Sequence, residues 1–116
     1  MEQPLPPYGA CLLGSINLPK FVRLPFQKSA TINYKKMRET MRAAVMMLDG
    51  VIDISKFPLE AQRAEAIRKR RMGIGITGLA DLFLMMGITY GSDESVKLTD
   101  EIMKMLAITA YETSVE

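Results

Sequence analysis

The chain has 116 residues, of which 48% are hydrophobic and 24% charged, a balance typical of a globular domain. It contains one cysteine and no histidine, which excludes an internal disulfide, a four-ligand structural zinc site and a Ser–His or Cys–His nucleophile pair. The net charge is +2, and no apolar run reaches the roughly 18 residues that a membrane span requires. We therefore expect neither a metal site nor a membrane association.

Charge is distributed unevenly along the chain. Residues 20–71 hold thirteen Lys and Arg against five Asp and Glu, whereas residues 81–116 hold two against seven. A basic half of this kind can attract phosphate groups, or it can dock onto the acidic half of the same chain. We expect docking between the two halves.

The N-terminal part is predicted to be extended. Five of the six prolines lie in the first 25 residues, and residues 2–8 cannot form a helix because proline lacks an amide donor and restricts the residue before it. Residues 11–18 are a short apolar run between Gly9 and Pro19, which predicts one short strand. Residues 23–32 are predicted to form a loop.

The following part is predicted to be helical. Apolar residues recur with three-and-four spacing over residues 33–54, and Asn33 is a suitable N-cap for a helix there. A second helix is predicted over residues 58–71, because the fixed φ of Pro58 suits a first turn and the cations at the other end complement the helix dipole.

Two further helices are predicted in the last third of the chain. One covers residues 75–86 and is closed by Gly87. The other covers residues 92–116, where Ser92 can cap the first turn and acidic residues follow near the positive end of the helix dipole. No stop signal for this helix occurs before Glu116.

Residues 73–78 match the G-x-G-x-x-G pattern of phosphate-binding loops. In that motif a buried strand leads into the glycines, whereas here a basic segment precedes them. We therefore expect no dinucleotide site. Gly73 and Gly75 are predicted to end one helix and to let the next helix pack closely.

The basic segment Arg68–Arg71 could meet a phosphate or a nucleic-acid backbone. No aromatic residues are interleaved with it for base stacking, so we expect no nucleic-acid partner. These cations are expected to be solvated at a helix end, or paired with an acid of the C-terminal half such as Asp81.

Cys11 is the one residue in the chain with redox or nucleophilic potential. A lone cysteine in an apolar run is usually a buried and inert thiol. Composition favours that interpretation, and a redox role is the alternative.

Three segments resemble signatures of ribonucleotide reductase catalytic subunits. Residues 2–18 resemble the stretch that begins inside the Asn-Pro-Cys-Gly-Glu active-site motif of this family, and they are most similar to its adenosylcobalamin-dependent, class II branch. Residues 48–53 and 70–81 resemble two further signatures. Their order and spacing agree with the family, so the resemblance covers essentially the whole chain.

The resemblance implies roles for two residues. Glu2 corresponds to the glutamate that handles a proton at the ribose 3′-hydroxyl while a cysteine thiyl radical abstracts the 3′-hydrogen. Cys11 corresponds to one of two cysteines that deliver reducing equivalents at the 2′-carbon and become a disulfide. The radical cysteine and the second reducing cysteine have no counterpart in the sequence. We therefore expect a fragment of a catalytic subunit that is inactive alone.

The resemblance also implies a fold, a cofactor and partners. The parent fold would be a ten-stranded α/β barrel, and this chain would be a mostly helical piece of it with one strand near residues 11–18. The intact enzyme would use adenosylcobalamin, act on a ribonucleoside di- or triphosphate, and be re-reduced by a thioredoxin-like or other thiol reductant. Its partner would be the remainder of the catalytic subunit, with oligomerisation open. It would supply deoxyribonucleotides for DNA replication in the cytoplasm.

Two alternatives stay open. One is a class I reductase, whose radical comes from a separate metal-containing subunit. The other is a non-catalytic helical interaction module that uses its basic surface to bind a partner.

Overall fold

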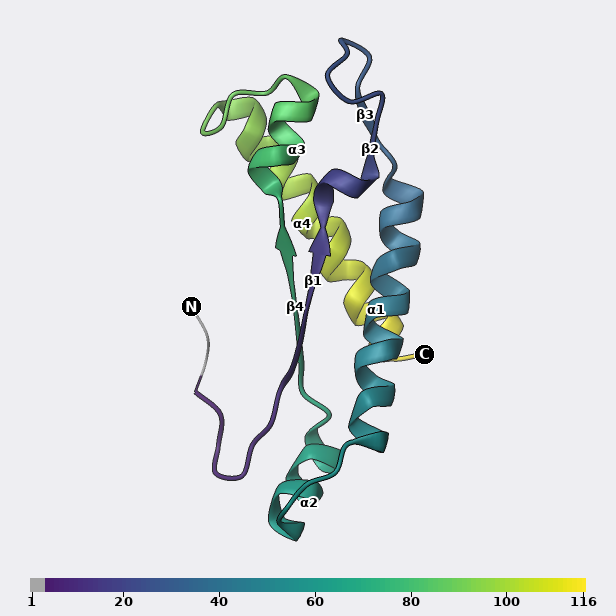
Figure 1. Cartoon of the computed structure of the whole chain (residues 1–116), viewed down its shortest axis with the longest axis vertical. Helices are drawn as coiled ribbons and strands as arrows, with labels where there is room; N and C mark the ends of the chain where they lie inside the picture. The colour runs from purple at the N-terminus through teal and green to yellow at the C-terminus, as the bar shows by residue number, and fades with distance from the viewer. Residues whose placement is uncertain (1–3) are drawn as a thin grey trace.

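A computed structural model describes residues 4–116 of the chain. It contains four α-helices, a short 3₁₀ helix and four strands, arranged as an elongated molecule of 55 × 26 × 21 Å (Figure 1). In chain order the elements are β1 Leu12–Asn17, the 3₁₀ helix η1 Leu18–Phe21, β2 Val22–Arg23, β3 Thr31–Ile32, α1 Tyr34–Ile54, α2 Glu60–Lys69, β4 Met72–Thr77, α3 Leu79–Met86 and α4 Asp93–Ser114.

The central feature is a parallel pair of strands, β1 and β4. Their register runs from Leu12 opposite Met72 to Asn17 opposite Thr77. The sequence predicted β1 but not β4, so the expectation of one strand was wrong. The 54 residues between the paired strands contain α1 and α2, which makes the connection a crossover rather than a hairpin.

The prediction that Gly73 and Gly75 separate two helices was also wrong. Both glycines lie inside β4, and the predicted helix over 75–86 begins only at Leu79. The segment Met-Gly-Ile-Gly-Ile-Thr alternates large and small side chains with the period of two that a strand requires. The glycines therefore occupy one face of a strand and do not form a phosphate-binding loop.

The other helices lie close to their predicted positions. The side chain of Asn33 accepts a hydrogen bond from the amide of Lys36 at the start of α1, and Ser92 caps α4 in the same way. The helix predicted over 58–71 is shorter at both ends, because Leu59 is extended and Arg70 adopts the left-handed conformation. The helix predicted over 92–116 ends at Ser114.

The predicted loop over 23–32 contains a small antiparallel hairpin. Val22 pairs with Ile32 and Arg23 with Thr31. The loop between these strands is held to α3 by a hydrogen bond from the amide of Phe26 to the carbonyl of Met85, 2.7 Å long.

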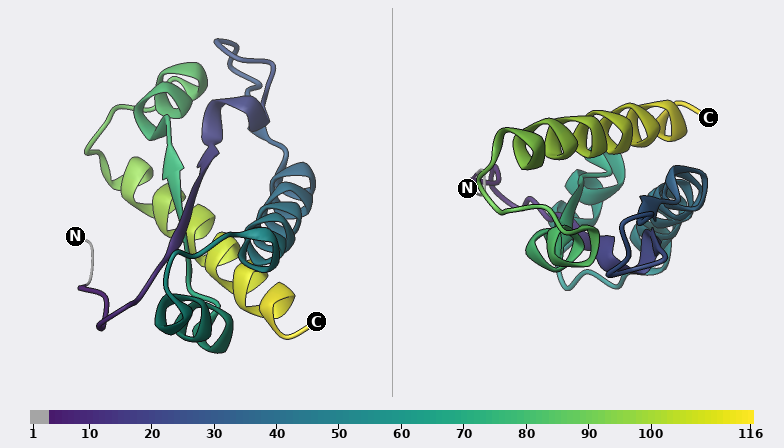
Figure 2. Two further views of the ribbon diagram at one scale, coloured as in Figure 1. Left: turned by 60° about the horizontal axis from the view of Figure 1, so that its bottom comes forward. Right: turned by 90° about the horizontal axis from the view of Figure 1, so that it is seen from above.

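One face of the β1–β4 pair is covered by helices. Figures 1 and 2 show α4 crossing this face obliquely, with α1 packed beside it. Ile16 of β1 and the half-buried Ile74 and Ile76 of β4 point into this core. The buried residues of the core are Ile16, Leu18, Phe21, Met37, Met41, Leu82, Phe83, Ile102 and Leu106.

The opposite face of the strand pair is open. Leu13 is 63% exposed, and Ser15, Asn17, Gly75 and Thr77 are exposed as well. Helices thus cover one side of the parallel strand pair, and no described helix covers the other. This arrangement is expected of a segment of an α/β barrel, in which the helices lie outside the strands. None of the helices over residues 4–116 is both long and apolar enough to cross a membrane.

Candidate active-site face

Cys11 lies immediately before β1 and is partly buried. A Cβ atom placed on Gly73 would lie 3.9 Å from Cys11 Sγ and 2.8 Å from Leu13 Cδ2. The thiol, Leu13 and Gly73 therefore share one side of the strand pair, which is the open side. The thiol is not a member of the buried core that composition alone favours for a lone cysteine.

The alternation of the two strands determines which other residues share this side with Cys11. Ser15 lies opposite Gly75, and Asn17 lies opposite Thr77. We call the set Cys11, Leu13, Ser15, Asn17, Gly73, Gly75 and Thr77 the open face. It is a narrow strip of small and polar side chains about 20 Å long, given a rise of about 3.3 Å per strand residue, with the thiol at one end.

At Gly73 and Gly75, β4 contributes no side chain to this strip. A side chain at Gly73 would collide with Leu13 at 2.8 Å, whereas one at Gly75 would reach Ser15 Oγ at 3.9 Å. Glycine at these positions leaves the backbone of β4 uncovered beside the thiol.

The far end of the open face is closed by Gly78, which has φ +73° and caps α3. A Cβ there would lie 2.5 Å from Pro19 Cδ and 3.3 Å from Asn17 Oδ1. The position requires glycine because both the backbone conformation and the contact with Pro19 exclude a side chain.

The near end is organised by Arg70, which has φ +44° although it is not glycine. Its Nε donates to Asp49 Oδ1 at 2.7 Å, and its Nη1 and Nη2 donate to the two carboxylate oxygens of Asp53 at 2.8 and 3.1 Å. Nη2 also donates to the carbonyl of Asp49 at 3.0 Å. We call Arg70 with Asp49 and Asp53 the Arg70 clamp.

The clamp shifts the pKa of Asp53 and the pKa of Arg70. The hydrogen bonds from Arg70 lower the pKa of Asp53, an effect partly opposed by burial. The hydrogen bonds to Asp49 and Asp53 raise the pKa of Arg70. Hydrogen bonds from Arg68 and Arg71 likewise lower the pKa of Glu65.

These pairs correct the expected partners of the basic cluster. The acids that meet Arg68, Arg70 and Arg71 lie in α1 and α2, and Asp81 is not among them. The basic and acidic halves contact each other through the packing of α1 against α4. Arg42 and Glu116 form the ion pair described between the halves.

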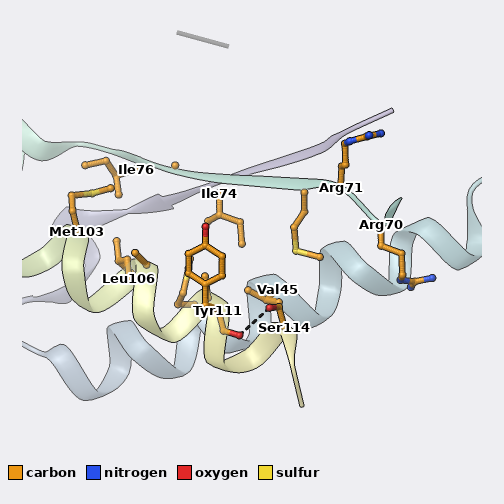
Figure 3. A pocket seen from close by; sticks show the side chains of 14 residues that line it. Val45, Arg70, Arg71, Ile74, Ile76, Met103, Leu106, Tyr111 and Ser114 are labelled. Atoms are coloured by element: carbon orange, nitrogen blue, oxygen red, sulfur yellow. Dashed lines mark hydrogen bonds between the residues drawn. The ribbon is translucent and has the colours of Figure 1, made fainter. Parts of the chain in front are cut away.

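A cavity of about 470 Å³ lies on the helix-covered side of β4 (Figure 3). Ile74 and Ile76 point from the strand toward Met103 and Leu106 of α4, whereas Arg71 points to the other side of the strand (Figure 3). The cavity lining is mainly apolar, and the open face lies across the sheet from it. Of the open face and the Arg70 clamp, Gly75 and Arg70 contribute to the cavity lining, whereas Cys11 does not.

Glu2 lies outside the described residues, so its predicted role at the ribose 3′-hydroxyl stays a prediction. The segment after it is non-helical as predicted: the amide of Gly9 donates to the carbonyl of Pro6 at 2.9 Å, and Tyr8 has φ +62°. Within residues 4–116, no three His, Cys, Asp or Glu side chains come together as metal ligands.

Sequence reasoning missed Arg70 and the open face of β4. The alternation of Met72, Ile74 and Ile76 with glycines could have indicated the strand. Nothing in the local sequence distinguishes Arg70 from its three basic neighbours, because its partners are 17 and 21 residues away.

Comparison with known proteins gives one consistent result. The family model described as "Ribonucleotide reductase, barrel domain" matches residues 1–116. A vitamin B12-dependent ribonucleoside-diphosphate reductase of Thermoplasma acidophilum is 36% identical over 113 residues, which are 97% of this chain and 14% of that relative.

Two further relatives agree with this result. One of the same name from Mycobacterium tuberculosis is 35% identical, again over 97% of this chain and 16% of the relative. The ribonucleoside-diphosphate reductase large subunit of Arabidopsis thaliana is 30% identical over 93% of this chain and 15% of that relative. The chain thus spans about a seventh of the length of these relatives.

Proposed function

The chain belongs to the ribonucleotide reductase barrel-domain family, and we propose that it forms part of a catalytic subunit that reduces ribonucleotides to deoxyribonucleotides. The observation that carries this proposal is the placement of Cys11 on the open face of a parallel strand pair whose other face is covered by helices. In an α/β barrel with helices outside, that open face would line the interior, and the proposal places the substrate beside it.

The proposed role of Cys11 is that of one of two reducing thiols. Loss of the 2′-hydroxyl as water leaves a carbon that must gain two electrons and a proton. Two thiols can supply two electrons and two protons as they join in a disulfide, and the second proton leaves with the hydroxyl as water. One cysteine cannot close this balance, so the second thiol must come from the remainder of the subunit.

Glu2 is proposed to act on the same substrate as a base. An ionised carboxylate close to the 3′-hydroxyl weakens the hold of oxygen on its proton while the neighbouring carbon becomes a radical. The Pro-rich segment between Glu2 and Cys11 is non-helical where it is described, over residues 4–11, and it turns at Pro7 and Tyr8, where the amide of Gly9 donates to the carbonyl of Pro6.

The remainder of the subunit is proposed to pair with the free edges of β1 and β4. Each strand has one partner among the described residues, so each presents an unpaired row of backbone amides and carbonyls. Exposed edges of this kind are a template for further strands, and closure of a barrel removes them.

Adenosylcobalamin is proposed as the cofactor of the whole enzyme because the relatives at 35% and 36% identity are named vitamin B12-dependent. The described residues do not form a site for it: the open face has no enclosing wall, and cofactor sites are concave. The relatives at 34% and 30% identity are named large chain and large subunit, without vitamin B12 in the name. A class I enzyme, whose radical comes from a separate subunit, therefore stays the alternative.

The proposal is tested by reassembling the enzyme from this chain and a complementary piece of a catalytic subunit, and assaying deoxynucleotide formation with a dithiol reductant. We expect Cys11→Ser to abolish sustained turnover, because a hydroxyl cannot form the disulfide. Ala43→Ser, an exposed change on α1, is the matched control. Omission of adenosylcobalamin distinguishes a class II from a class I enzyme.

Isotope exchange between cofactor and solvent should survive in the Cys11→Ser enzyme, because the radical step uses a different cysteine. Normal turnover of the Cys11→Ser enzyme with its thiol reductant would return Cys11 to the interpretation of a half-buried apolar residue. Deoxynucleotide formation by the 116-residue chain alone would overturn the partial-site assignment itself.

A further inference from the structure

The connection between α2 and β4 contains a left-handed residue that is not glycine. Arg70 has φ +44° and ψ +48°, and its amide closes the last turn of α2 by donating to the carbonyl of Ala66 at 2.8 Å. Helices that end in this way usually place glycine at the left-handed position, because a side chain is disfavoured there. Arg70 is one of four non-glycine residues with positive φ in the described part of the chain, and its side chain makes contacts that glycine could not make.

The side chain of Arg70 makes four hydrogen bonds to α1, three to carboxylate oxygens and one to a backbone carbonyl. Its fork meets both oxygens of Asp53, the bidentate geometry that orients a guanidinium most strongly. A lysine could not reproduce this arrangement, since an ammonium group is a point charge without a planar fork.

The helix that receives Arg70 is itself well anchored. Met41, Val45, Leu48 and Ile52 of α1 are all buried, so Asp49 and Asp53 extend from a helix that is held by packing along its length. The clamp therefore attaches the start of β4 to a helix that is itself fixed by packing.

The start of β4 is also the wall beside Cys11. The amide of Leu12 donates to the carbonyl of Arg71 at 3.2 Å, and Gly73 follows opposite Leu13, with its missing side chain facing Cys11 Sγ. Two residues, Arg71 and Met72, separate Arg70 from Gly73, and β4 is extended from Met72 onward. The position of Arg70 thus determines where the wall stands.

We propose that Arg70 is a positioning residue for Cys11: its clamp on Asp49 and Asp53 of α1 holds the first residues of β4 in register beside the thiol. The meaning of this for catalysis rests on the proposed redox role of Cys11, whereas the positioning itself does not. Cys11 would be presented to its partner thiol at a defined place because the wall beside it cannot shift.

The experiment measures the rate at which iodoacetamide alkylates Cys11 in the folded chain, followed by mass spectrometry. The chain has one cysteine, so one product forms. We expect Arg70→Gln to raise the rate about tenfold, because the α2–β4 connection then opens locally and exposes the thiol. Asp53→Asn should raise the rate in the same direction.

Three variants make the measurement specific. Arg68→Gln is the matched control, because its partner Glu65 is still bound by Arg71, and its rate should equal that of the unchanged chain. Arg70→Lys should give an intermediate rate. The double variant Arg70→Gln with Asp53→Asn should react no faster than Arg70→Gln alone, since both changes remove the same contact.

A merely structural role would give different results. If alkylation requires global unfolding, low concentrations of urea should raise its rate with the same slope that urea denaturation gives for the free energy of unfolding. If it requires only local opening, its rate should be nearly independent of urea. A full urea dependence, or a rate for Arg70→Gln within twofold of the unchanged chain, would overturn the proposal. If Arg70→Gln does not fold, the rates of Arg70→Lys and Asp53→Asn decide by the same criteria.

The outcomes for this proposal and for the proposed function are separable. Alkylation reports on positioning without any turnover, and the activity of the Cys11→Ser enzyme reports on the redox role. In the reassembled enzyme, Arg70→Gln should lower kcat and leave the KM for the ribonucleotide unchanged, because the Arg70 side chain is engaged by Asp49 and Asp53 and acts through the position of Cys11. If alkylation is faster and kcat is unchanged, Arg70 positions Cys11 but this positioning does not contribute to catalysis.

Discussion

The two ends of the β1–β4 pair are held in different ways. At the end formed by Asn17 and Thr77, the chain enters a packed core in which Leu18, Leu82 and Ile102 have no exposed surface. At the end that carries Cys11, β4 is held to α1 by the Arg70 clamp.

The difference matters because the two kinds of attachment respond to different conditions. Apolar packing is non-directional and depends little on pH or salt. Hydrogen bonds between charged groups are directional, so they fix orientation, but they weaken when a carboxylate is protonated and when salt screens exposed charges. The candidate reducing thiol therefore lies at the end where directional hydrogen bonds between charged groups hold β4 to α1.

The comparison predicts its largest effect at the packed end. Leu82→Ala should lower the free energy of unfolding by about 3 kcal/mol, because it leaves a cavity in the core that the surrounding side chains cannot fill. Leu84→Ala on the same helix is the control: Leu84 is 68% exposed, and the change should stay within about 0.5 kcal/mol. Urea denaturation measures both. Equal effects would mean that this end is not held by packing.

A smaller effect is expected at the turn that closes the packed end. Gly78→Ala should cost about 1–3 kcal/mol, because the new Cβ would meet Pro19 at 2.5 Å in a left-handed backbone conformation. Gly50→Ala, within α1 and with nothing close to the new Cβ, should instead stabilise by about 0.5–1 kcal/mol. A neutral or stabilising Gly78→Ala would show that α3 can move away from η1 without loss.

The smallest effect concerns pH at the polar end. Arginine hydrogen bonds lower the pKa of Asp53 and that of Glu65 in the folded chain. A lowered folded pKa means that the stabilisation is present above the ordinary carboxyl pKa of about 4 and is lost as the pH falls through the lower folded value. Unfolding measured between about pH 6 and pH 3 should show this decline.

The control for the pH experiment is Arg70→Gln, which removes the cause of the shift at Asp53. Its stability should decline less steeply over the same pH interval, because the arginine hydrogen bonds that lower the pKa of Asp53 in the folded chain are then absent. Parallel curves for the variant and the unchanged chain would show that the clamp contributes nothing to the acid sensitivity.

Local chemistry predicted the helices that carry their own signals. The caps at Asn33 and Ser92 and the terminating Gly87 are properties of single side chains and their immediate neighbours, and each lies where the sequence indicated. The short strand near residues 11–18 was likewise predicted from an apolar run bounded by glycine and proline, and it is present as Leu12–Asn17. The family resemblance rested on similarly local motifs, and the family match over residues 1–116 bears it out.

By itself, the sequence thus determined the caps, the helical periodicity, the first strand and the candidate thiol, because each depends on residues close together in the chain. Only the tertiary structure decided that residues 72–77 are a strand, since their glycines lower strand preference and the pairing partner lies 60 residues away. It also decided that Arg70, among four neighbouring cations, is the one bound by Asp49 and Asp53. Such a choice depends on how α1 and β4 meet in space, and no local pattern contains that information.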